Sequence, residues 1–164
     1  MNAPVPSPRS LDRFLDRLSE LMPRFMQAAL LEERTLLSSG LVTLPQLWAL
    51  AHLDRGGACR ASNLARALRL TPPTVTALVD RLAALRLVCR HADPRDRRVV
   101  RVELTPLGRR RMAEFHAEKR KSARRHFGAL SVRDRDTYLA VLAKLVRQAE
   151  ADGIIPEWPN SRKR

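Results

Sequence analysis

Apolar residues recur every three or four positions over most of the chain, a period that predicts α-helices. The first such region covers residues 10–40, and Ser10 can cap the helix that begins there. Pro23 interrupts the region and must kink the helix or split it in two. No element next to it in sequence covers its apolar face fully, so this face packs against the C-terminal helices or against a second chain. The face consists of Leu11, Phe14, Leu15, Leu18, Leu21, Met22, Phe25 and Met26.

Two shorter helices are predicted next. Thr43 with Gln46 three residues later forms a capping box, which marks the start of the first. Residues 54–57 then form a turn, and Ser62 can cap the second helix. The predicted buried residues are Leu44, Leu47, Trp48, Leu50 and Ala51 in the first helix, and Leu64, Ala65 and Leu68 in the second.

The next helix begins sharply at Thr71, a cap residue, followed by two prolines that suit a first turn without intrahelical N–H partners. Its buried stripe is Val75, Leu78, Val79, Leu82 and Leu85, and its outer face carries Thr74, Ala77 and Arg81. Residues three and four apart share a helix face, so a hydroxyl, a methyl group and a cation project together away from the core. Such a face can enter the major groove of DNA.

After Arg86 the apolar period changes to two, which predicts β-strands. Residues 93–96 read Asp-Pro-Arg-Asp, which is turn chemistry, so the two strands form a hairpin. The β-branched residues of these strands are Val88, Val99, Val100 and Val102. Residues 69–71 connect the helix at 71 to the short helix before it, and this length suits a helix-turn-helix motif. The pattern therefore predicts a helix-turn-helix with a basic hairpin, or wing, beside it.

Two long helices follow the hairpin. The first, residues 106–127, starts at Thr105 with proline in the first helical position, and Gly128 ends it. Ser131 caps the second, which Gly153 ends. The second helix carries a seam typical of helix packed on helix, made of Val132, Leu139, Leu142, Val146 and Ala149.

Composition and charge narrow the class of partner. The 164 residues are 45% hydrophobic but only 4% aromatic, which favours helices over a β-sandwich. The net charge is +14, and residues 86–125 hold fourteen Arg or Lys against five Asp or Glu, a local excess of nine. A polyanion is the expected partner, and nucleic acid suits a groove-sized helix beside a basic wing better than a membrane does. The alternative is a basic surface that only keeps the protein in solution.

Other classes of protein are disfavoured. No segment reaches the ~20 apolar residues needed to span a bilayer, and the N-terminus has no signal-peptide pattern, so a cytoplasmic location is expected. Two cysteines, Cys59 and Cys89, do not form a disulfide framework and are expected to be reduced. There is no Gly-rich phosphate loop, no nucleophile elbow and no paired carboxylates in an apolar setting, so the chain is not expected to be an enzyme.

The wing sequence follows the pattern D-x-R, five residues, then L-T. The matching residues are Asp96, Arg98, Leu104 and Thr105. The segment TVTALVDRL, residues 74–82, and Gly108 after the wing match as well. In these motifs, between about Leu41 and Gly108, the chain resembles the MarR family of bacterial transcriptional regulators, which are dimeric winged helix-turn-helix proteins. Ala77 is a difference, because the family often has Arg there.

This resemblance implies a mainly α fold with a small β-hairpin wing. Residues 41–105 would form the winged helix-turn-helix region, flanked by dimerisation helices at residues 10–40 and 106–153. Residues 1–9, with three prolines, are expected to be a disordered lead, and residues 154–164 a mobile tail. The implied function is that of a homodimeric, effector-responsive repressor on a pseudo-palindromic DNA site. The alternative is a non-specific architectural DNA- or RNA-binding basic protein, whose affinity comes from charge alone.

The candidate DNA-binding residues lie on the helix after Thr71 and at the wing. They are Thr71, Pro73, Thr74, Thr76, Ala77, Arg81, Arg95, Asp96, Arg97 and Arg98. A guanidinium on a narrow ribbon can enter a minor groove, where the potential is negative. By resemblance, Arg98 is the wing arginine and Asp96 the carboxylate that orients it. The hydroxyls of Thr74 and Thr76 can reach bases or phosphates; the alternative is that they only complete the helix cap.

Small-molecule and metal sites are less clearly marked. Many relatives bind small aromatic or phenolic acids between the dimerisation helices and the DNA-binding lobe, and the resemblance implies a similar effector. The candidates by position are Arg13, Phe14, Trp48 and His52. Cys89 and His91 share one face of a strand, but they could hold a metal only with ligands from elsewhere, so no metal or other cofactor is predicted. The family's peroxide sensors carry their cysteine near the N-terminus, so both thiols here are expected to be inert.

Overall fold

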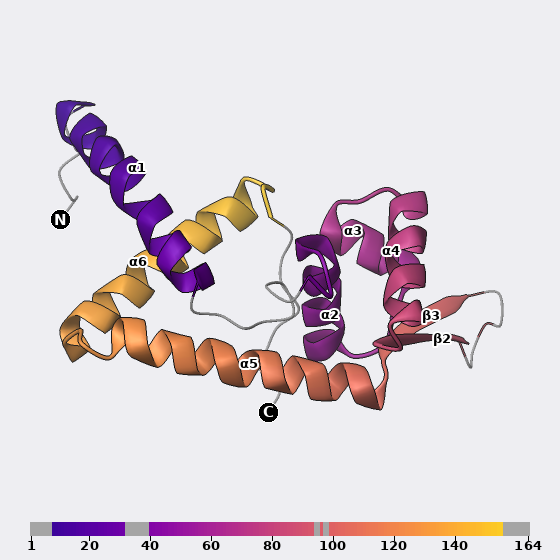
Figure 1. The fold of residues 1–164 in the computed structure, drawn as a ribbon. Helices are drawn as coiled ribbons and strands as arrows, with labels where there is room; N and C mark the ends of the chain where they lie inside the picture. Colours follow the sequence, from indigo (N-terminus) through magenta and orange to yellow (C-terminus); the bar gives the residue numbers. More distant parts are fainter. Residues whose placement is uncertain (1–7, 32–39, 94–95, 97–98, 156–164) are drawn as a thin grey trace. The chain divides into compact units, whose positions relative to one another are not determined.

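The computed structural model describes residues 8–31, 40–93, 96 and 99–155. Over these residues six α-helices and one three-stranded sheet follow in the order α1, α2, β1, α3, α4, β2, β3, α5, α6 (Figure 1). This confirms the predicted mainly α fold with a small hairpin. The chain divides into two compact units, residues 1–33 and residues 34–164, which we describe separately.

The first unit contains α1 (Pro8–Leu31), a single helix with Pro23 inside it, so the region is not split in two. The helix starts two residues earlier than predicted, and Ser10 lies inside it instead of capping it. Proline suits the first helical position because it lacks the N–H that would have no partner there. The eight apolar residues named above are 36% to 59% exposed in the single chain.

In the second unit, α2 (Leu44–Gly56) begins as predicted, and the Gln46 side chain accepts a hydrogen bond of 2.9 Å from the Thr43 N–H. Its buried residues are Gln46, Leu47, Ala49, Leu50 and Leu53. The predicted burial of Leu44 and Trp48 is wrong, since these side chains are 46% and 47% exposed. Only one side of α2 faces the elements it packs on, which are α3, α4, α5 and β3, and the apolar residues on its other side stay exposed. The helix also continues through the predicted turn to Gly56.

The helix-turn-helix consists of α3 (Ala61–Leu68) and α4 (Pro72–Ala84). Ser62 does not cap α3, because Arg60 already belongs to strand β1 (Cys59–Arg60) and its extended backbone makes it the cap position. Arg69 takes a left-handed conformation with φ 53°, and the Leu70 N–H donates 3.0 Å to the Ala65 carbonyl, which closes the predicted turn. α4 starts at its Thr71 cap as predicted and buries Val75, Leu78, Val79 and Leu82.

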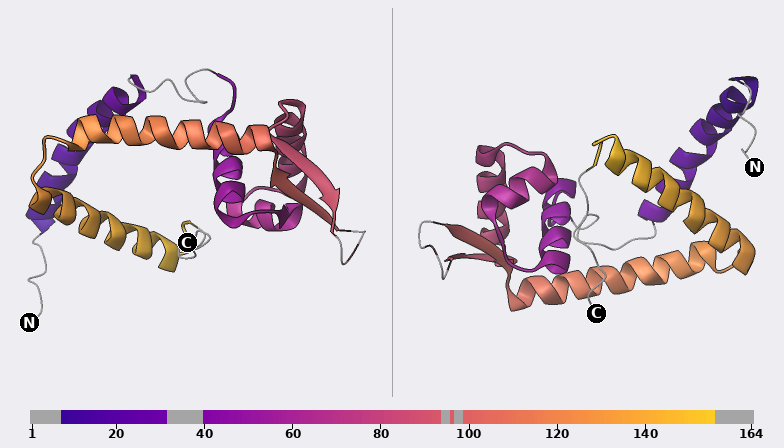
Figure 2. Two further views of the ribbon diagram at one scale, coloured as in Figure 1. Left: turned by 90° about the horizontal axis from the view of Figure 1, so that it is seen from below. Right: turned by 180° about the vertical axis from the view of Figure 1, so that it is seen from behind.

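The wing is the antiparallel pair β2 (Val88–Ala92) and β3 (Val100–Leu104). The sheet order is β1-β3-β2, so a third strand that the sequence did not predict lies on the far side of β3. Val88, Val102 and Leu104 are buried in the core. Figure 2 shows the hairpin extending beyond α4 and α5 leaving from its base.

α5 (Pro106–Phe127) and α6 (Val132–Ala151) have the predicted bounds. Thr105 ties the start of α5 to the turn before β2, because its hydroxyl donates 2.6 Å to the Arg86 carbonyl and its N–H donates 3.0 Å to the Leu87 carbonyl. Gly108 is packed against the same turn, where a Cβ would overlap the Leu87 carbonyl oxygen. None of the residues of α6 is buried in the single chain.

Candidate nucleic-acid interface

The start of α4 presents the predicted DNA-contact residues at the surface. Thr71, Pro73, Thr74, Thr76, Ala77 and Arg81 are all exposed. The Thr71 and Thr74 hydroxyls lie 2.8 Å apart, and the Thr76 hydroxyl donates 3.0 Å to the Pro72 carbonyl. Each hydroxyl oxygen keeps a lone pair that can accept a hydrogen bond from a base or a bridging water. The contacts therefore serve the helix start in the free chain, and leave an acceptor-lined surface for a partner.

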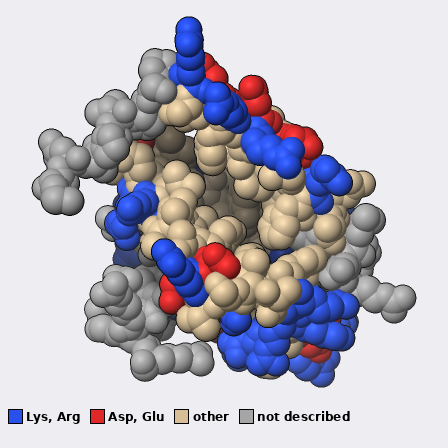
Figure 3. All heavy atoms as spheres, turned by 90° about the vertical axis from the view of Figure 1, so that its left-hand side faces the viewer, with Lys and Arg blue, Asp and Glu red and all other residues tan. Residues whose placement is uncertain are grey.

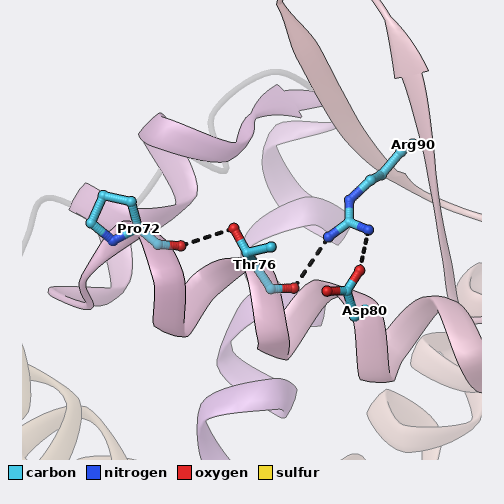
Figure 4. Close-up of polar contacts among 4 residues, drawn as sticks. All are labelled: Pro72, Thr76, Asp80 and Arg90. Atoms are coloured by element: carbon cyan, nitrogen blue, oxygen red, sulfur yellow. Dashed lines mark hydrogen bonds and ion pairs between the residues drawn. The ribbon is translucent and has the colours of Figure 1, made fainter.

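Arg90 on β2 connects the wing to α4 (Figure 4). Its guanidinium forms an ion pair with Asp80, and Nη2 donates 3.1 Å to the Thr76 carbonyl. Arg90 lies opposite the fully buried Val102 in the sheet register, so it points to the side of the hairpin that faces α4. The brace fixes the hairpin relative to the exposed face of α4. The sequence analysis missed it, although an arginine in phase with Val88 signals a charge that needs a partner on the core side.

Hydrogen bonds also define the base of the wing turn. The Asp93 N–H donates 2.8 Å to the Val99 carbonyl, and the Val99 N–H donates 2.9 Å to the Asp96 carbonyl. Asp93 is buried, and Arg101 lies 3.4 Å from its carboxylate while also donating 2.8 Å to the Ala58 carbonyl. Asp96 is exposed, as a DNA-facing residue must be. The predicted contacts Arg95, Arg97 and Arg98 lie outside the described residues.

Positive charge is concentrated on α5 as well. The exposed cations of this helix are Arg109, Arg110, Arg111, Lys119, Arg120, Lys121, Arg124 and Arg125. In Figure 3, Lys and Arg (blue) gather densely along the lower part of the view, next to broad areas without charge (tan). In the described part of the chain, no helix is long and apolar enough to cross a membrane. The exposed charge is therefore of the kind that attracts a polyanion.

The four effector candidates fall on two elements. Trp48 and His52 are one turn apart on α2, and burial lowers the pKa of His52 below its ordinary value, so its neutral form is favoured. Arg13 and Phe14 lie on α1, where they line a surface hollow. These elements belong to different units, and a joint site stays a prediction.

The two thiols are shielded from reaction. Burial raises the pKa of Cys59, and burial together with the charge and hydrogen bonding of Glu103 raises the pKa of Cys89. A thiol with a raised pKa is protonated at neutral pH, and only the thiolate reacts readily with oxidants.

Comparisons with known proteins agree with this arrangement. The family model described as "MarR family" matches residues 42–99. The chain is 32% identical over 111 residues to the HTH-type transcriptional repressor MdtR of Bacillus subtilis (strain 168), which covers 68% of this chain and 72% of that protein.

Two solved structures extend the likeness to the fold. BpsR of Bordetella bronchiseptica, whose DNA binding is described as regulated by 6-hydroxynicotinic acid, is 28% identical with a TM-score of 0.58, over 79% of this chain and 98% of that one. YusO of Bacillus subtilis is 24% identical with a TM-score of 0.68, over 87% and 99%. The match to MdtR, the family model and the winged helix-turn-helix lead to one conclusion: the chain belongs to the MarR family of transcriptional regulators.

Proposed function

We propose that this transcriptional regulator acts as a homodimeric, effector-responsive repressor that places α4 in the major groove of a pseudo-palindromic DNA site. The observation that carries the proposal is the exposed, hydroxyl-rich start of α4, held by Arg90 and Asp80 beside a basic hairpin. Two such helices, related by a dimer axis, would enter successive major grooves with half-site centres about one helical turn apart. The protein would act by binding and not by catalysis.

Base choice is assigned to Thr74, Thr76 and their neighbours, and Arg81 to a phosphate contact. Hydroxyls can bond to bases or phosphates, whereas an arginine one turn further along the exposed face adds charge near the backbone. The wing arginines, which the sequence alone assigns, would read the adjacent minor groove by its width and potential.

A pair of variants tests this division of work. Thr74→Ala removes no charge, so it should relax discrimination at one position of each half-site and leave the salt dependence unchanged. Arg81→Ala should weaken specific and random duplexes alike, and should make the log-log salt slope shallower by up to about two units for a dimer. The measurement is binding of both variants to one operator and its base-substituted forms at several salt concentrations. Discrimination unchanged in Thr74→Ala would remove this residue from base readout.

The homodimer is supported by the apolar faces of α1 and α6. On α6, Leu139, Leu142 and Leu145 are 60%, 42% and 63% exposed in the single chain. Soluble monomers rarely expose contiguous apolar patches of this kind, so a second copy of the chain is the proposed cover. These faces belong to the dimerisation regions expected at residues 10–40 and 106–153.

Sedimentation of matched α6 variants tests the dimer. Leu139→Glu places a charge on the apolar face and should shift the protein toward monomer, because burying an unpaired carboxylate costs several kcal/mol. Lys144→Glu, on the same helix, is the control and should sediment as the parent protein does. A parent protein that sediments as a monomer at micromolar concentration would contradict the proposal.

The effector is proposed to be a small aromatic acid. BpsR is the member whose DNA binding is described as regulated by such a molecule, 6-hydroxynicotinic acid. Trp48 offers an exposed aromatic surface and His52 a ring nitrogen one turn away, while Arg13 offers a cation for a carboxylate. The probe is 6-hydroxynicotinic acid, with benzoic acid beside it. Release of operator DNA by the parent protein but not by Trp48→Ala is expected, and no release by either acid would count against this part.

The second candidate function is non-specific binding of DNA or RNA. The net charge of +14 and the exposed cations of α5 favour it, since charge alone gives sequence-independent affinity. A charge-driven binder would give up its preferred duplex in excess random DNA, whereas a specific regulator would keep it.

A further inference from the structure

Three metal-ligating side chains meet on the face of the wing that is turned away from the core. The Cys89 Sγ lies 3.7 Å from Glu103 Oε1, and the His91 Nδ1 lies 3.7 Å from the same oxygen. All three ligand atoms lie within 4.8 Å of one another. This cluster is separate from the exposed face of α4 and from the effector candidates.

The sheet register explains why the three residues gather. Cys89 and His91 are two positions apart on β2, so their side chains share a face. Cys89 pairs directly with Glu103 on β3, and cross-strand partners also share a face. The strand pattern alone showed the Cys89 and His91 pair without a further ligand, and the pairing with β3 supplies Glu103.

The donor set and its spacing suit one class of ion. Thiolate, imidazole and carboxylate are the three ligand types that Zn²⁺ takes in proteins, at roughly 2.3, 2.0 and 2.1 Å. A tetrahedral ion at those bond lengths holds its ligand atoms about 3.3 to 3.6 Å apart. The two distances of 3.7 Å therefore need only a few tenths of an ångström of closure.

We propose that the wing binds one divalent transition-metal ion of the zinc class through Cys89 Sγ, His91 Nδ1 and a Glu103 carboxylate oxygen, with a fourth position open to water. Because the ligands come from both strands, the ion would join β2 to β3 and hold the hairpin in one conformation. The proposal goes beyond DNA binding, and its test does not depend on the operator.

The surrounding charges leave the cluster open to a cation. Arg101 lies opposite His91 in the register, but its guanidinium contacts Asp93 and the Ala58 carbonyl. Arg109 donates 2.7 Å to the Leu104 carbonyl. Within the described part of the chain, the Glu103 side chain has contacts only with Cys89 and His91. The His91 and Glu103 side chains are 39% and 42% exposed, so an ion can reach them from solvent.

Titration with Co²⁺ tests the site, using the full-length, untagged protein stripped of metal. Cobalt takes the same ligands as zinc, and a bound thiolate gives a charge-transfer band in the near ultraviolet. One ion per chain with this band is expected. Cys89→Ser should abolish the band, and Glu103→Gln and His91→Ala should each weaken Co²⁺ binding about tenfold or more.

Cys59→Ser is the matched control, because Cys59 pairs with Val102 and so lies on the opposite face of the sheet. It should keep the band and the affinity of the parent protein. A parent protein without a thiolate band, a band that survives Cys89→Ser, or a band lost in Cys59→Ser would overturn the proposal. Glu103→Gln keeps both thiols, so Co²⁺ binding unchanged in that variant would overturn the three-ligand site even if Cys89→Ser failed to fold.

Discussion

The brace between the wing and α4 gives a prediction with two opposite outcomes. Arg90 could hold the hairpin in place, as its contacts with Asp80 and the Thr76 carbonyl indicate, or it could serve as one more phosphate contact. Arg90→Gln removes the cation, and Asp80→Asn removes its partner while leaving the cation. The two variants and their double mutant separate the roles.

The magnitude follows from exposure. The Arg90 and Asp80 side chains are 33% and 57% exposed, so solvent screens the pair and it is worth about 0.5 kcal/mol. The hydrogen bond to the Thr76 carbonyl adds about 1 kcal/mol. Arg90→Gln should therefore lower the free energy of unfolding by about 1.5 kcal/mol, and Asp80→Asn by about 0.5 kcal/mol. In the double-mutant cycle, the coupling energy should be about 0.5 kcal/mol.

Urea unfolding and DNA titration are the two assays. If the brace positions the wing, both single variants weaken operator binding, by about fivefold per subunit for a 1 kcal/mol repositioning cost. The salt slope stays that of the parent protein, since no phosphate contact is lost. A phosphate contact predicts the reverse: Arg90→Gln would make the slope shallower by about one unit per subunit, and Asp80→Asn would bind at least as tightly as the parent. That pattern would refute the brace.

Three further predictions concern stability and the thiols. Gly108→Ala should cost about 3 kcal/mol or more in urea unfolding, because its Cβ would overlap the Leu87 carbonyl oxygen and only backbone movement could relieve the clash; a loss below about 1 kcal/mol would contradict the packing of α5 on that turn. Burial lowers the pKa of His52, so the unfolded chain binds more protons near pH 6, and stability should fall as pH drops below about 6.5; His52→Gln should reduce this loss between pH 7.5 and 5.5, and a pH profile like that of the parent would argue against it. Burial raises the pKa of both thiols, so peroxide treatment of the metal-free protein should leave operator affinity unchanged, as it should in Cys59→Ser/Cys89→Ser; loss of the operator by the oxidised parent, with binding kept by the double variant, would show a redox switch.

Local signals made much of the fold predictable. Thr71 before two prolines, Thr105 before Pro106, and Ser131 each mark a helix start through hydrogen bonds within four residues. The change of period after Arg86 located both wing strands, because alternation depends only on which face is buried. These features also placed the exposed face of α4.

Features that depend on distant partners were not predictable. Which side of α2 is buried depends on where α4 and β3 pack, so Leu44 and Trp48 were assigned to the wrong side. Strand β1 has two residues and exists only because it pairs with β3, more than forty positions away in the chain. The contacts of Arg90 with Asp80 and of Cys89 with Glu103 likewise follow from strand register and helix placement.

Selection of DNA from a random pool by the purified protein tests the central claim most directly. The selected duplex is then titrated in the presence of excess random DNA at physiological salt. If α4 and the wing read DNA as proposed, the pool converges on a pseudo-palindrome with half-site centres about one helical turn apart, and this duplex stays bound under competition. A pool that does not converge, or a duplex displaced in proportion to the random DNA added, would show that charge alone drives binding and would contradict the account.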